Sequence, residues 1–190
     1  MLTFTQFLRE AAQKGEAVNT VFEERLFGLV GVMHRIADTL TAGGIPYEVI
    51  GGMAVLIHVE EVSPELSSLT RDVDLLVRRS DLDRIQQVAT KNGSRFRHAA
   101  GADVLVEDGA RIAVRLFFSE AFASERKQIH GKDVLVIPVA DLLQMKLTSF
   151  RLKDQVHVQS MDAAGLITPE VEAKLTPELA ERLQRVRESD

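Results

Sequence analysis

The chain has 190 residues and a formal net charge of −5, with 45% of its residues hydrophobic and 27% charged. This length and composition predict one domain with a full hydrophobic core and exclude a disordered chain. The sequence contains no cysteine, which excludes disulfides, zinc sites built on thiolates and a cysteine nucleophile. The acidic balance also argues against non-specific nucleic-acid binding through a basic surface.

The sequence has no segment suited to a membrane. No stretch reaches the roughly 20 apolar residues that a spanning helix needs. Arg9 and Glu10 stand where a signal peptide would carry its apolar segment. We therefore expect a soluble, cytoplasmic protein without a membrane partner.

Helices are predicted for the first part of the chain. The stretch FTQFLREAAQ (4–13) predicts a short helix. Thr20 and Glu23 form a capping-box pattern ahead of a longer amphipathic helix that runs to Leu40. The glycine pair 43–44 ends it.

A strand, a glycine pair and a short helix follow. Residues 46–50 predict the strand, Gly51 and Gly52 the turn, and residues 53–59 the helix. After a polar loop, VDLLV (73–77) predicts the next strand.

A second helix and a hairpin are predicted for the middle of the chain. Ser80 and Asp83 form a capping pattern for the helix. The pair Asp108-Gly109 predicts a two-residue turn between strands near 102–107 and 110–118.

Helices dominate the last part of the chain. After a short strand at 134–137, the sequence predicts four of them: 139–150, 153–164 and two short helices opened by Thr168-Pro169 and Thr176-Pro177. This order predicts an α/β (α+β) fold, a mixed sheet flanked by helices with a helical C-terminal portion. We place the core with its N-terminal helices at 1–137, and the helical portion packed on it at 138–190.

Two acidic residues stand two positions apart in TRDVDLLV (70–77). Alternate residues of a strand point to one face about 7 Å apart, so Asp72 and Asp74 converge while their apolar neighbours enter the core. Two carboxylates repel each other unless a cation lies between them, and Mg²⁺ prefers one or two carboxylates with phosphate oxygens. The alternative is a solvated strand start, where aspartate is common.

Gly51 and Gly52 favour the first alternative. A strand-to-helix turn made of glycine exposes backbone N–H groups and the positive end of a helix, which attract phosphate. A tight turn needs glycine in any case, so the pair alone is weak evidence. Followed by a carboxylate pair on the next strand, it predicts a site for a nucleoside triphosphate with its metal.

Three stretches carry a resemblance to a known family: GGMAVLIH (51–58), TRDVDLLV (70–77) and KLTSFRLKD (146–154). Together with the hairpin strand, they resemble the nucleotidyltransferase superfamily that includes polymerase β, over roughly residues 46–165. Within it, the chain is most similar to the minimal nucleotidyltransferases and the abortive-infection toxin nucleotidyltransferases of two-component systems. The resemblance implies a nucleotidyltransferase-like fold, ATP or another nucleoside triphosphate as substrate, and Mg²⁺ as cofactor.

The resemblance also implies a role for each matching residue. The implied site consists of Gly51 and Gly52 for the triphosphate, Asp72 and Asp74 as catalytic metal ligands, Lys146 as a catalytic cation, and Arg71 as a further nucleotide-binding residue. Arg115 is added as a candidate nucleotide-binding residue, although it does not match the family pattern. Arg151, Lys153 and Asp154 lie in the matching downstream stretch.

Two positions depart from the family pattern. The family's third metal-binding acid belongs on the strand in IAVRLFF (112–118), where this chain has Arg115. An acid is also expected three residues after Asp154, where the chain has His157.

The predicted hairpin register places Arg115 opposite Ala102, among small apolar neighbours. An unpaired charge that leaves water is unfavourable, so Arg115 needs a partner, and Asp72 and Asp74 are the candidates. The alternative is that its side chain extends along the surface to water.

Three functions stay open. An active enzyme would transfer a nucleoside monophosphate from a triphosphate to a hydroxyl of a protein, an RNA or a small molecule. A catalytically degenerate member would bind a nucleotide or a partner protein, with Arg115 replacing the metal. A structural module would use the mixed-charge C-terminal helices to bind a partner protein or a second copy of the chain.

Overall fold

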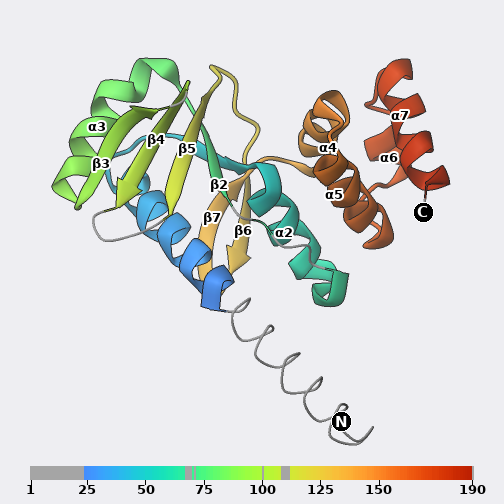
Figure 1. Cartoon of the computed structure of the whole chain (residues 1–190), viewed down its shortest axis with the longest axis horizontal. Helices are drawn as coiled ribbons and strands as arrows, with labels where there is room; N and C mark the ends of the chain where they lie inside the picture. The colour runs from blue at the N-terminus through green and yellow to red at the C-terminus, as the bar shows by residue number, and fades with distance from the viewer. Residues whose placement is uncertain (1–23, 67–69, 71, 100, 108–111, 190) are drawn as a thin grey trace, which may run out of the picture.

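The structure is a computed structural model that describes residues 24–66, 70, 72–99, 101–107 and 112–189 (Figure 1). Several predicted features lie outside these residues: the short helix at 4–13, the Thr20 and Glu23 capping box, Arg71 and the Asp108-Gly109 turn.

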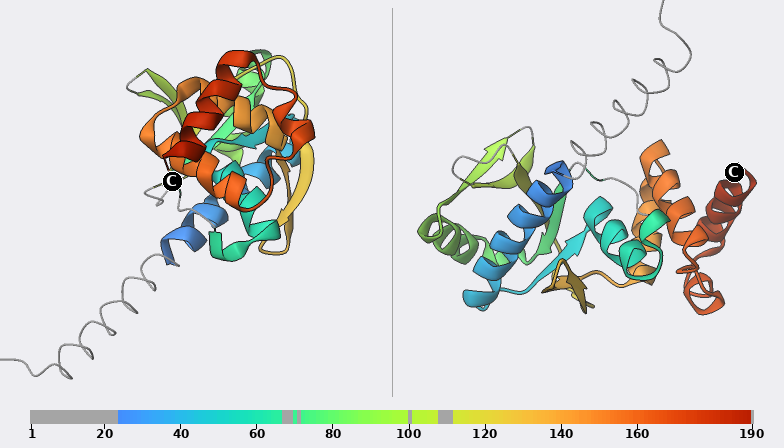
Figure 2. Two further views of the ribbon diagram at one scale, coloured as in Figure 1. Left: turned by 90° about the vertical axis from the view of Figure 1, so that its right-hand side faces the viewer. Right: turned by 90° about the horizontal axis from the view of Figure 1, so that it is seen from below.

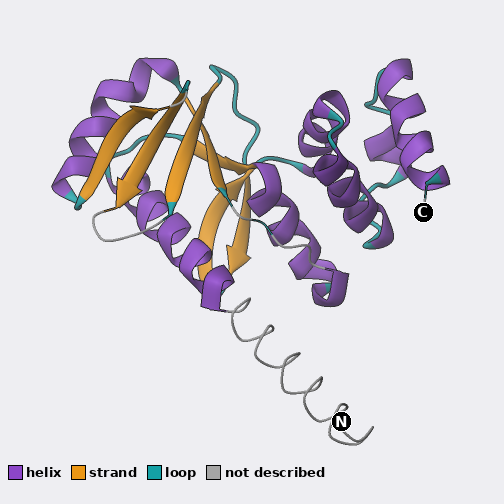
Figure 3. Cartoon of the chain, viewed as in Figure 1, coloured by secondary structure: helices purple, strands orange, loops and turns teal. Residues whose placement is uncertain are grey.

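The described chain begins with a helix at 24–42 and closes with a series of helices around a central set of strands (Figure 3). The elements after the first helix are β1 (Tyr47–Ile50), α2 (Gly51–Val62), a 3₁₀ turn (Pro64–Leu66), β2 (Val73–Val77), a 3₁₀ turn (Arg79–Asp81), α3 (Leu82–Lys91), β3 (Ser94–Ala99), β4 (Ala102–Glu107), β5 (Ala113–Phe118), β6 (Glu125–Ile129), β7 (Lys132–Val136), α4 (Val139–Ser149), α5 (Leu152–Ala163), α6 (Pro169–Glu172) and α7 (Pro177–Glu188).

The strands form one mixed sheet in the order β3-β4-β5-β2-β1-β7-β6. The central strand β2 is antiparallel to β1 and parallel to β5, and β1 is parallel to β7. The predicted fold class, a mixed sheet with flanking helices and a helical C-terminal portion, is confirmed.

The register of β4 and β5 differs from the prediction. Val104 lies opposite Arg115 and Val106 opposite Ala113, whereas a two-residue turn would place Ala102 opposite Arg115. The predicted register is therefore wrong by two residues, because the connection between the last paired residues is longer than two. Side chains alternate along a strand, so a shift of two leaves Arg115 on the predicted face.

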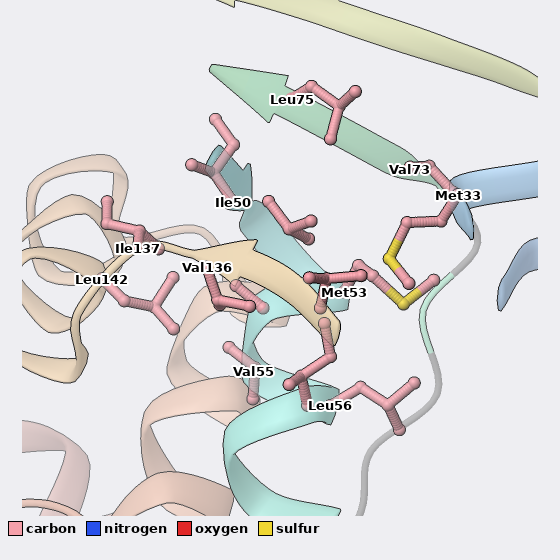
Figure 4. Close-up of a cluster of buried hydrophobic side chains, with 14 of the residues drawn as sticks. Met33, Ile50, Met53, Val55, Leu56, Val73, Leu75, Val136, Ile137 and Leu142 are labelled. Carbon is pink, nitrogen blue, oxygen red and sulfur yellow. The ribbon is translucent and has the colours of Figure 1, made fainter. Parts of the chain in front are cut away.

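Alternate residues of β2 pack into the hydrophobic core. Val73, Leu75 and Val77 are fully buried, and the helix at 24–42 runs along this face of the sheet (Figures 1 and 2). In Figure 4, Met33 of that helix lies in one cluster with Met53 of α2 and the buried side chains of β2. Asp74, which lies between Val73 and Leu75, must therefore point to the opposite face, as must Asp72 just before the strand.

The C-terminal helices pack on the core through α2. Helices α4 and α5 contact α2, and α7 packs on α4 and α5, so the group lies at one end of the sheet (Figures 1 and 2). Phe150 ends α4 in the left-handed region (φ 48°), and α5 begins two residues later. This sharp turn brings the end of α4 and the start of α5 together. No helix among the described residues has the length and apolar content to cross a bilayer.

The helix starts agree with the predictions in part. The predicted helix starts at Thr168-Pro169 and Thr176-Pro177 are confirmed, and the hydroxyls of both threonines accept hydrogen bonds from the first turns of α6 and α7. Ser80 lies inside a 3₁₀ turn, and the residue before α3 is Asp81, which makes no side-chain capping bond. The predicted capping role of Ser80 is therefore wrong.

Candidate nucleotide-binding site

A pocket of about 790 Å³ opens between the central strands, the start of α2 and the α4–α5 turn. It brings together every predicted site residue that the structure describes: Gly51, Gly52, Asp72, Asp74, Arg115 and Lys146. These residues come from four separate elements or their ends, α2, β2, β5 and α4, so only the fold joins them.

The two glycines at the start of α2 are required by the protein's own packing. Gly51 has a φ of +71°, and a Cβ on it would lie 2.5 Å from Oδ2 of Asp74. A Cβ on Gly52 would lie 2.6 Å from Oγ1 of Thr70 and 3.3 Å from Cε1 of His157. Glycine at these positions is therefore explained before any ligand is considered, and its presence alone does not indicate phosphate binding.

The start of α2 is the feature of the pocket that suits an anion. The residue before the helix is Ile50, which has no side-chain acceptor, and the first turn contains no acidic residue. The first N–H groups of a helix have no partner within it and carry partial positive charge. Because Gly51 and Gly52 line the pocket, this positive helix end faces it.

Arg115 binds Asp74 of β2 and also Asp72, which directly precedes that strand. It lies directly opposite Asp74 in the parallel pairing of β2 and β5. Its Nε donates to Oδ1 of Asp74 at 2.6 Å, and its Nη2 donates to Oδ2 of Asp74 at 2.9 Å and to Oδ2 of Asp72 at 3.1 Å. The hydrogen bond to Asp74 raises the pKa of Arg115, with the nearby carboxylate charges adding to it. The predicted pairing of Arg115 with the two acids is confirmed.

This arrangement does not fit Mg²⁺. Both oxygens of Asp74 and one oxygen of Asp72 accept hydrogen bonds from a guanidinium, whose charge repels a second cation from the same place. Within the described part of the chain, no group of three or more His, Asp or Glu side chains is placed to hold a metal. The magnesium role of the two aspartates stays a prediction.

Lys146 is bound to a buried aspartate. Its Nζ donates to Oδ1 of Asp154 at 3.1 Å, and the exposed fractions of the two side chains are 5% and 1%. Oδ2 of the same carboxylate accepts from Ser149 and from Nε of Arg151. Burial alone would raise the pKa of Asp154, but these donors outweigh it and hold the pKa well below the usual range. Burial also lowers the pKa of Lys146, against the pull of Asp154.

His157 lies between this ion pair and the glycine turn. Its side chain is buried, and its Nδ1 has no hydrogen-bond partner among the residues that the structure describes. Burial, followed by the charge of Lys146, lowers its pKa to about 4, so the ring is neutral at neutral pH. The sequence marked His157 only as a departure from the family pattern; its burial against Gly52 depends on how α5 packs.

Lys153 differs from the other basic residues of the pocket. It is exposed at the start of α5, and it makes no ion pair with any described residue. The charged residues that line the described pocket give a formal net charge of +1, from Arg115, Lys146, Arg151 and Lys153 against Asp72, Asp74 and Asp154. The pocket can therefore accept an anion without a further cation.

One wall of the pocket is apolar. Phe117 is 44% exposed there, and Leu76, Phe118 and Met145 extend the same lining. An exposed aromatic ring beside a positively charged region provides a surface on which a nucleobase can stack.

Solved structures with a similar fold include several nucleotidyltransferases. The crystal structure of ANT(2")-Ia in complex with adenylyl-2"-tobramycin has a TM-score of 0.58 and 13% identity over 84% of this chain and 97% of that one. An antigenic nucleotidyltransferase-like protein from Paracoccidioides brasiliensis has a TM-score of 0.60 and 17% identity over 87% and 88%. The Megavirus polyadenylate synthase has a TM-score of 0.58 and 11% identity, and the match covers 88% of this chain but 39% of the synthase.

The chain has a nucleotidyltransferase fold. This finding confirms the fold that the three sequence stretches implied. No protein-family model and no curated protein sequence matches the chain. A fold does not determine a function, so the function of this nucleotidyltransferase-fold protein depends on the chemistry of its site.

Proposed function

We propose that the pocket binds a nucleoside triphosphate and that the protein transfers the nucleoside monophosphate group to an acceptor hydroxyl. The observation that carries the proposal is the uncapped start of α2, which faces a pocket of net positive charge within a nucleotidyltransferase fold. One protein of this fold was solved in complex with adenylyl-2"-tobramycin, an adenylylated small molecule, so the fold accommodates such a ligand.

The phosphates of the bound nucleotide would lie at the start of α2. Backbone N–H groups at Gly51 and Gly52 supply donors there, and the helix end supplies partial positive charge. Lys153 lines the same pocket, makes no ion pair with any described residue and would bind the outer phosphates. Phe117 would pack against the base or the acceptor.

Transfer requires a new bond between the acceptor oxygen and the α-phosphorus, while the bond from that phosphorus to pyrophosphate breaks. The proton of the acceptor hydroxyl must pass to a base. Asp72 is the candidate, because its side chain is 45% exposed and its Oδ1 accepts from no described residue. An aspartate takes up the substrate hydroxyl proton in the same way in protein kinases.

A second candidate function is nucleotide binding without transfer. It is favoured by Arg115, which stands in the slot of the family's third acid and removes three carboxylate oxygens from other roles. The protein would then respond to a nucleotide or present it to a partner.

Two measurements separate these functions. Titration calorimetry with ATP, GTP, CTP and UTP tests binding, with Lys153→Ala as the variant and Lys91→Ala, on α3, as the control. We expect the Lys153 variant to bind about three- to tenfold more weakly, the range for one lost charged hydrogen bond. Triphosphates labelled at the α-phosphate, incubated with protein, RNA and small-molecule fractions, then test transfer.

Labelling of an acceptor by the parent, and its loss when Asp72 is replaced by asparagine, supports the enzymatic function. Binding without labelling of any fraction supports the second candidate. If no triphosphate binds in the presence or absence of Mg²⁺, the proposal is wrong.

A further inference from the structure

Only part of the Arg115 guanidinium donates hydrogen bonds within the described structure. This group has a planar fork of five N–H donors, shared among Nε, Nη1 and Nη2. Nε and Nη2 are used by Asp74 and Asp72, while Nη1 donates to no described residue. The side chain is 34% exposed and lines the pocket, so an edge of the cation remains accessible.

The held edge is fixed in place. Asp74 has 11% of its side chain exposed, and its carboxylate lies so close to Gly51 that a methyl group would not fit between them. Arg115 and Asp74 are also level with each other on paired strands. A bidentate guanidinium–carboxylate pair between two paired strands has a fixed orientation, whereas an unpaired cation on a flexible side chain does not.

The same carboxylate places Arg115 beside the start of α2. Oδ2 of Asp74 accepts from Nη2 of Arg115, and it is also the atom closest to the missing Cβ of Gly51. The guanidinium and the first residue of the helix therefore lie against one oxygen atom. An anion bound at the start of α2 would therefore lie close to the guanidinium of Arg115.

We infer that Arg115 takes the place of the metal: its free edge binds a phosphate oxygen of the nucleotide, and triphosphate binding needs no divalent cation. The inference rests on the proposed nucleotide site and deepens it. Asp72 and Asp74 act as positioning residues that orient Arg115. The formal charge of +1 around the described pocket, before any ion is added, has the sign that this role requires.

The test uses the full chain and titration calorimetry with two ligands, ATP and inorganic tripolyphosphate, each in EDTA and in millimolar Mg²⁺. We expect both ligands to bind in EDTA, with a dissociation constant within about twofold of that in Mg²⁺. Arg115→Gln should weaken binding in EDTA by tenfold or more, because a charged hydrogen bond is lost. Arg115→Lys keeps the positive charge but not the planar fork of donors, so its affinity in EDTA should lie between those of the parent and Arg115→Gln.

Arg35→Gln is the matched control. Arg35 binds Glu107 through the same two nitrogens, Nε and Nη2, but from the helix at 24–42 on the other face of the sheet. The Arg35→Gln variant should bind ATP and tripolyphosphate with the same dissociation constants as the parent in each buffer.

Binding that appears only in Mg²⁺ would overturn the inference and leave the proposed function standing. The absence of binding in both buffers would overturn both. The comparison of the two buffers needs no variant, so it decides the question even if Arg115→Gln does not fold. A folded Arg115→Gln that binds tripolyphosphate in EDTA as tightly as the parent would also contradict the inference.

Discussion

Nε of Arg115 donates to Oδ1 of Asp74 at 2.6 Å across two parallel strands in which the two residues stand opposite each other. The acid pair of β2 is therefore compensated by a cation from the chain itself. In a site built for a metal, the same acids would repel each other in the free protein. The two arrangements predict opposite effects when one acid is neutralised.

Asp74→Asn should destabilise the protein by about 1–2 kcal/mol, because it leaves the half-buried Arg115 without its charged partner. Asp72→Asn should change the free energy of unfolding by less than about 0.5 kcal/mol, since that side chain is nearly half exposed. Urea unfolding in EDTA measures both. An Asp74→Asn variant as stable as the parent would show that the ion pair contributes nothing.

Gly51→Ala should destabilise by more than the strain of its positive φ. Gly93 provides the control, because its φ is +76° and a Cβ there would meet nothing within 4 Å. Gly93→Ala should lower the free energy of unfolding by about 1 kcal/mol, from backbone strain alone. Gly51→Ala should lose at least about twice as much, since the methyl group displaces the carboxylate of Asp74. Equal losses in thermal melts would mean that the contact with Asp74 is easily relieved.

Asp154→Asn should be among the most damaging single changes in the pocket, with a loss of about 3 kcal/mol. It removes the charge that compensates the buried ammonium of Lys146. Lys153→Ala, one residue away but exposed, should change stability by less than about 0.5 kcal/mol. Chemical denaturation of the two variants compares them directly, and similar losses would contradict the reading of Lys146 and Asp154 as a buried pair.

His157 makes the free energy of unfolding depend on pH in the mildly acidic range. Its pKa is about 4 in the folded protein and near 6.5 when unfolded, so between these values the unfolded chain binds more protons. The contribution is complete above pH 6.5 and is lost as pH falls toward 4, on the order of 3 kcal/mol in all. Buried His34 and His58 also have lowered pKa values, but they are present in both proteins and cancel in a comparison with His157→Gln.

We expect the free energy of unfolding of the parent to fall more steeply than that of His157→Gln over this range. Parallel curves for the two proteins would show that His157 is protonated normally in the folded state.

The sequence predicted the central strands and most helices because their apolar residues are periodic and their ends carry Gly, Pro or Thr. It missed β3 (SRFRHA) and β6 (ERKQI), whose side chains are mostly exposed. Both are edge strands of the sheet, so they carry no alternating apolar signal. The register of β4 and β5 was also missed, since a local Asp-Gly turn signal does not determine how two strands match their buried residues.

The candidate site was predictable to a similar degree. Strand alternation predicts that Asp72 and Asp74 share a face, and Arg115 joins them because a charge among apolar neighbours needs a charged partner. The closing of Lys146 onto Asp154 was not predictable, because it depends on the left-handed residue Phe150 that turns α4 into α5. The packing reason for the glycine pair likewise requires the positions of neighbouring side chains.

The most direct test of the account is a crystal structure of the full chain with ATP and Mg²⁺. We predict phosphate density at the N–H groups of Gly51 and Gly52, with Arg115 in contact with a phosphate oxygen and still bound to Asp72 and Asp74. A magnesium ion between the two aspartates, with Arg115 displaced, would contradict the role assigned to Arg115. A nucleotide bound anywhere else on the molecule would contradict the site itself.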